Sequence, residues 1–124
     1  MIKLITPLQM LARLLIALQV ILGLTIWFGV ISVTQIHIAL GSLFVLDVWI
    51  IALIALFALP RRMLPFITLI MGGIVMWFGV AQRTMMLGEL HWAVRVVHLL
   101  LGLATMGLVE PLVKAVKQHE ASKT

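Results

Sequence analysis

The stretch that decides the fold runs from Leu14 to Leu46 and reads LLIALQVILGLTIWFGVISVTQIHIALGSLFVL. Over these 33 residues there is no Lys, Arg, Asp or Glu. As a single α-helix the stretch would be about 50 Å long, whereas the hydrocarbon core of a bilayer is about 30 Å thick. We therefore expect the chain to turn back between Gly29 and Gln35, where glycine, β-branched and small polar residues cluster.

The rest of the 124-residue chain is similarly apolar. It is 64% hydrophobic with a mean hydropathy of +1.25, which excludes a soluble domain. Two further turns are marked by the prolines and arginines of 60–65 and by the polar run 81–90. The sequence predicts an all-α membrane protein, a four-transmembrane up-down helix bundle in one domain over 1–124. The expected helices are 8–30, 35–59, 65–80 and 91–113.

The basic residues are distributed unevenly between the two ends of this bundle. Arg83 and Arg95 belong to one end, and the other end holds Lys3, Arg13, Arg61, Arg62, Lys114, Lys117 and Lys123. Because Lys and Arg concentrate on the cytoplasmic side, both termini are expected to be cytoplasmic, in a cytoplasmic (inner) membrane. The net charge of +5 then reflects topology. The lipid bilayer is the expected surrounding partner, and the dispersed charges do not favour nucleic-acid binding.

The chain contains no cysteine. This excludes disulfides, thiolate metal sites, iron–sulfur clusters and covalent c-type haem attachment. Any bound metal centre must use His, Met or carboxylate ligands.

Two histidines occur in the same local pattern, His-x-x-Leu-Gly, at His37 and His98. An intramembrane histidine is costly and usually has a partner or a ligand. The second and fourth helices of an up-down bundle are parallel and diagonal, with axes about 12–14 Å apart. Two imidazoles facing each other across that diagonal leave room for an iron and its macrocycle. We therefore predict one haem b per chain, ligated by His37 and His98.

Gly41 and Gly102 follow the two histidines by four residues, so each lies on the same helix face one turn deeper. We expect these glycines to leave a gap in the side-chain wall for a flat ring. Such clearance favours a macrocycle over a bare metal ion.

A second pair of matching segments suggests an internal repeat. The segment IWFGV at 26–30 matches MWFGV at 76–80, and the histidine motifs match at a larger offset. The simplest interpretation is a duplicated helical hairpin with extra residues in the second loop.

Arg95 and His91 lie on the outer part of the fourth expected helix, near His98. Arg95 is predicted to pair with a haem propionate, although it could equally pair with Glu89 or extend to the surface. His91 could hydrogen-bond a propionate or be an ordinary interfacial histidine.

Two acids also fall within expected helices. Asp47 is either bonded to a neighbouring helix or part of a proton or quinol path, and these interpretations are evenly matched. Glu110 is expected to form a structural ion pair with Arg13 or Lys114.

The segment QVILGLT at 19–25 resembles the Gln-x-x-Leu-Gly-x-x-Thr motif of the haem A synthase family, with the threonine one position early. Followed by His37 and His98, the chain is similar to one four-helix half of that family, and more loosely to four-helix b-type cytochromes of the membrane. The resemblance implies one haem held by His37 and His98. Thr34 occupies the position of a glutamate in the family's catalytic half, so the resemblance points to haem binding and leans against an enzyme.

The leading hypothesis is thus a membrane b-type cytochrome that exchanges electrons with quinol or a partner subunit and could form a homodimer. Bis-histidine ligation leaves no open iron position, which favours electron transfer over oxygen chemistry. The alternative is a structural accessory subunit without haem, in which the histidines donate interhelical hydrogen bonds. A small multidrug-type transporter and a copper site at Met85, Met86 and His91 are minor alternatives.

Overall fold

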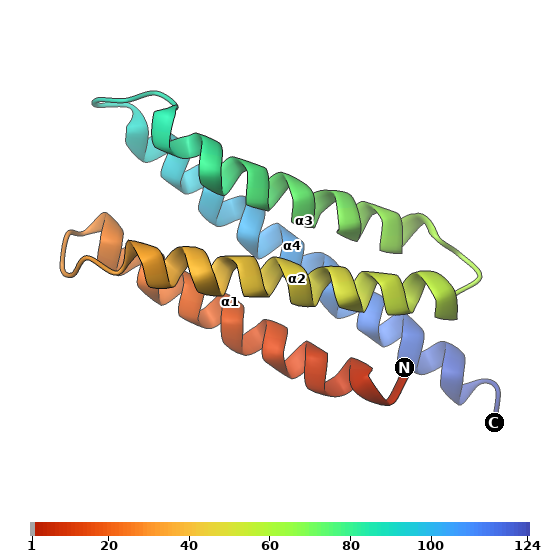
Figure 1. Ribbon diagram of the computed structural model, residues 1–124. Helices are drawn as coiled ribbons and strands as arrows, with labels where there is room; N and C mark the ends of the chain where they lie inside the picture. The colour runs from red at the N-terminus through yellow and green to blue at the C-terminus, as the bar shows by residue number, and fades with distance from the viewer. Residues whose placement is uncertain (1) are drawn as a thin grey trace.

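The computed structural model describes residues 2–124. Within them the chain forms four long α-helices, which are α1 (Ile5–Trp27), α2 (Thr34–Ala58), α3 (Met63–Ala81) and α4 (His91–Ala121) (Figure 1). Short 3-10 turns precede α1 at Ile2–Leu4 and follow α3 at Gln82–Thr84. Each long helix is long and apolar enough to cross a membrane. The predicted all-α bundle of four potential membrane spans is confirmed.

The helices run up and down, so that the connections alternate between two ends (Figure 1). We call the end with both termini and the α2–α3 loop the inner end, and the end with the α1–α2 and α3–α4 loops the outer end. Helix α2 packs between α1 and α3, and it also contacts α4 across the bundle. The parallel helices α2 and α4 therefore form the close diagonal of the bundle.

The helix ends differ from the predicted ones for local reasons. Helix α1 stops at Trp27, three residues early, and Gly29 continues the turn with a φ of +66°. Helix α3 starts at Met63, two residues before the predicted start at Pro65. A proline is tolerated in the first turn of a helix, because the N–H group that it lacks would have no hydrogen-bond partner within the helix there. Helix α4 continues to Ala121, well past the predicted 113, because its polar last turns need no apolar partner.

The packed core fills the inner half of the bundle. Buried side chains line facing stripes of all four helices, namely Ile5, Gln9, Ala12, Leu15, Phe44, Val45, Val48, Ile51, Ala52, Ile54, Ala55, Thr68, Val75, Thr105, Val109, Leu112, Val113 and Val116. Trp49 joins α2 to α3 by donating from Nε1 to the Leu69 carbonyl at 3.1 Å. A Cβ at Gly72 would lie 2.6 Å from that Nε1, so glycine is needed for this approach.

The outer half is packed differently. Among residues 16–27, 34–43, 76–81 and 91–104, Val94 alone is buried. Neighbouring helices still contact one another there, but their side chains do not close a core. Both histidines of the paired motif lie in this half.

Candidate functional site

The structure brings His37 of α2 and His98 of α4 together inside the outer half of the bundle. Their ring centroids are 6.3 Å apart and their planes are inclined by 69°. Two imidazoles that bind one metal ion from opposite sides, with metal–nitrogen bonds of about 2 Å each, have centroids about 6 Å apart. The separation matches the distance between two ligands of one ion, and it also lies within the range of about 4.5–7 Å of an ordinary edge contact between two rings.

Neither imidazole is satisfied by the protein. The Nδ1 atoms of His37 and His98 are both buried and have no hydrogen-bond partner within residues 2–124. A buried polar group without a partner costs about 1–3 kcal/mol, so its presence calls for an explanation such as a ligand. Phe78 of α3 stacks on His98 with centroids 6.1 Å apart and planes 11° apart, which limits the rotation of that ring.

The glycines that contact the imidazoles belong to the other two helices. A Cβ at Gly23 of α1 would lie 3.4 Å from Cε1 of His37, and one at Gly79 of α3 would lie 3.1 Å from Cε1 of His98. Each histidine thus faces a bare stretch of backbone on the helix beside it. The imidazoles themselves fill the space that side chains at Gly23 and Gly79 would take, so these glycines let the two histidine rings pack against the neighbouring helices.

The two glycines expected from the sequence face side chains of α1. Gly41 faces the side chain of Gln19, whose Oε1 would be 3.2 Å from a Cβ, and Gly102 faces Ile16. Gln19 donates from Nε2 to the backbone carbonyl of His37 at 2.9 Å, which fixes α2 against α1 beside the ligand. Gly41 therefore leaves room for the Gln19 amide, which in turn holds the backbone of His37.

Gln19, Gly23, Phe78 and Gly79 are the neighbours that the residue patterns did not assign to the site. Gln19 and Gly23 were visible as part of the motif at 19–25, and their spacing of four places both on one face of α1. Gly79 was visible only as part of the repeated MWFGV. Its counterpart in the repeat, Gly29, lies in a loop, so the two copies are used differently.

Arg95 and His91 occupy the outer rim of the same helix. The Arg95 guanidinium lies 5.9 Å from the centre of the Trp27 ring, a cation–π arrangement that joins α4 to the end of α1. Within residues 2–124 Arg95 has no carboxylate partner, so the pairing with Glu89 is absent there. His91 Nδ1 lies 3.1 Å from the Met85 carbonyl, which anchors the outer loop.

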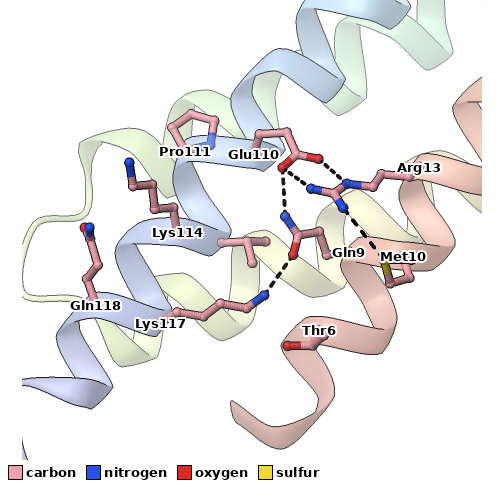
Figure 2. A pocket seen from close by; sticks show the side chains of 10 residues that line it. Thr6, Gln9, Met10, Arg13, Glu110, Pro111, Lys114, Lys117 and Gln118 are labelled. Carbon is pink, nitrogen blue, oxygen red and sulfur yellow. Dashed lines mark hydrogen bonds and ion pairs between the residues drawn. The ribbon is translucent and has the colours of Figure 1, made fainter.

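The two acids have opposite environments. Asp47 is 2% exposed and both carboxyl oxygens lack hydrogen-bond partners within residues 2–124. Glu110 forms the ion pair expected with Arg13, with Nε–Oε1 at 2.7 Å and Nη2–Oε2 at 2.8 Å, and also accepts from Gln9 (Figure 2).

The donor set constrains what the histidine pair can hold. Residues 2–124 contain no group of three or more His, Cys, Asp or Glu side chains that would hold a metal ion. A bare ion bound by protein alone needs three or four such donors, whereas a porphyrin brings four nitrogens and needs only two axial ligands. The pair therefore fits a macrocycle better than a bare ion.

Comparisons with protein-family models, with curated proteins and with solved structures found no match for this chain.

Proposed function

We propose that the chain is a membrane b-type cytochrome that holds one haem b between His37 and His98 and carries single electrons. The observation that supports this most directly is the 6.3 Å separation of the two rings across the α2–α4 diagonal. The unpaired Nδ1 atoms and the absence of a packed core around them are additional support.

The residues around the pair have distinct roles in this proposal. His37 and His98 would each donate an imidazole nitrogen to the haem iron, which favours electron transfer over oxygen chemistry. The haem supplies a reversible one-electron couple. Gln19 and Phe78 hold the two ligands in place, and Arg95 provides the outer-rim cation that a propionate would pair with.

The site lies near the outer end, away from the termini. With Lys and Arg concentrated at the inner end, we propose that both termini are cytoplasmic and that electrons are exchanged with quinol or a partner subunit near the opposite surface. The accessory-subunit alternative requires histidines that join helices by hydrogen bonds. The side chains of His37 and His98 make none within residues 2–124, so this alternative has no contact to support it.

A haem titration of the purified apoprotein tests the proposal. We expect one haem per chain, loss of binding in His37→Ala and in His98→Ala, and unchanged binding in His119→Ala, which removes a histidine of the inner end. Equal binding by all four proteins, or a stoichiometry that does not depend on either ligand, would refute the proposal.

A further inference from the structure

A cleft with both polar and apolar lining lies at the inner end between α1 and α4 (Figure 2). Its volume is about 630 Å³, within the range of about 300–1,000 Å³ found for ligand sites. The polar groups that line it are Thr6, Gln9 and Arg13 of α1 and Glu110, Lys114, Lys117 and Gln118 of α4.

The one acid in the cleft is fully occupied. Glu110 accepts two hydrogen bonds from Arg13 and one from Gln9, at 2.7–2.8 Å. The Gln9 side chain in turn accepts from Lys117 Nζ at 2.9 Å, so the four residues form one chain of contacts (Figure 2). These contacts hold Gln9 and Glu110 in place. The negative charge of Glu110 is paired with Arg13, so it does not neutralise the two lysines.

The lysines leave the cleft positively charged. Three cations, Arg13, Lys114 and Lys117, face one carboxylate, which gives a formal charge of +2. Lys117 uses one of its three donors, and Lys114 has no hydrogen-bond partner within residues 2–124. Both ammonium groups are exposed at the inner end. They are available to an anion that enters from outside the bundle.

We propose that this cleft binds the phosphate group of an anionic phospholipid. Apolar side chains continue from the cleft along the lipid-facing side of α1, where Met10 is 57% and Leu14 58% exposed. An acyl chain can lie along them while the headgroup phosphate meets Lys114 and Lys117. Basic pockets between membrane helices at the cytoplasmic surface recognise anionic headgroups in this way. The proposal depends on membrane insertion but not on the histidine site.

The test measures lipid retention by native mass spectrometry of the detergent-purified protein, with phosphatidylglycerol, phosphatidylcholine and inorganic phosphate as separate probes. Wild-type protein should retain phosphatidylglycerol. Each lysine is expected to contribute about fivefold, so Lys114→Gln/Lys117→Gln should weaken retention about twenty-five-fold. The control Lys3→Gln/Lys123→Gln removes the same charge outside the cleft and should behave as wild type.

A second variant and two further outcomes keep the test decisive. If the double variant fails to fold, as judged by circular dichroism, Lys114→Gln alone should lose about fivefold. Equal retention of phosphatidylcholine, or unchanged retention in folded lysine variants, would overturn the proposal. Binding of inorganic phosphate as tightly as phosphatidylglycerol would overturn the lipid assignment. Haem content, measured on the same samples, reports separately on the histidine site.

Discussion

Both halves of this bundle consist of apolar helices, but the inner half has a packed core and the outer half does not. In the inner half, side chains of all four helices close a core, and the ion pair of Arg13 with Glu110 is completed by Gln9. In the outer half, only Val94 is buried, and the two facing histidines have unpaired Nδ1 atoms. Polar groups that the protein satisfies itself are structural. Those that it brings together and leaves unsatisfied indicate a binding site.

After replacement of the two histidines themselves, the largest effect is expected from placing a side chain beside His98. In Gly79→Val, side-chain atoms would enter the position 3.1 Å from Cε1 of His98 and displace the ring, so we expect at least a tenfold loss of haem affinity. Gly73→Val is the matched control on the same helix, because nothing lies within 4 Å of its Cβ position. Haem titration compares the two. Equal affinities would show that the space beside His98 is not used.

Asp47 is an exception to this difference between the two halves. It belongs to the packed inner half, yet neither of its carboxyl oxygens has a hydrogen-bond partner within residues 2–124. Replacing it with valine removes an unsatisfied buried group at a modest change in size, and should raise the free energy of unfolding by about 1–3 kcal/mol. Thermal unfolding in detergent measures this. A lower melting temperature in Asp47→Val would show instead that the carboxyl group has a stabilising partner in the membrane.

The ion pair of the inner half should behave as one unit. Arg13→Gln and Glu110→Gln are each expected to lower the melting temperature by at most a few degrees, because the two side chains are 50% and 38% exposed and an exposed ion pair contributes little to stability. The double variant should lose less than the sum of the two, since the second change removes a group that is already unpaired. Strictly additive losses would mean that the contact contributes nothing of its own.

The smallest effect concerns the outer rim. Arg95→Gln removes a cation one turn from His98, and loss of positive charge should lower the haem midpoint potential by an amount on the order of tens of millivolts. Arg83→Gln removes the same charge from the outer loop and is the control. Redox titration of both proteins checks the expectation. An equal shift in both would indicate general surface charge rather than a specific position.

Much of this arrangement could be predicted from the sequence because membrane constraints act on the chain locally. The uncharged run from Leu14 to Leu46 requires a turn, and matching histidine motifs on alternate helices lead to a diagonal pair. The position of the ion pair of Glu110 could also be predicted. These inferences need only helix length, helix direction and charge.

The neighbours of the histidines could not be predicted, because they depend on the rotation of one helix against another. Gly41 shares a face with His37 within α2, but the residue opposite it is set by the register of α1, which places Gln19 there and Gly23 against His37. Similarly, the repeat suggests that Gly29 and Gly79 are equivalent, although one helix ends before its glycine and the other continues past it. Sequence spacing predicts which residues share one face of a helix. Which residues of the neighbouring helix they contact depends on how the two helices are shifted and rotated against each other.

The most direct test of the central claim is the reduced-minus-oxidised absorption spectrum of the protein purified from haem-sufficient cells, recorded for wild type, His37→Ala and His98→Ala. The account predicts a sharp low-spin b-type spectrum in the wild type that either substitution abolishes while the helices stay folded. A colourless wild-type protein, or a haem spectrum that persists when His37 and His98 are each replaced, would contradict it.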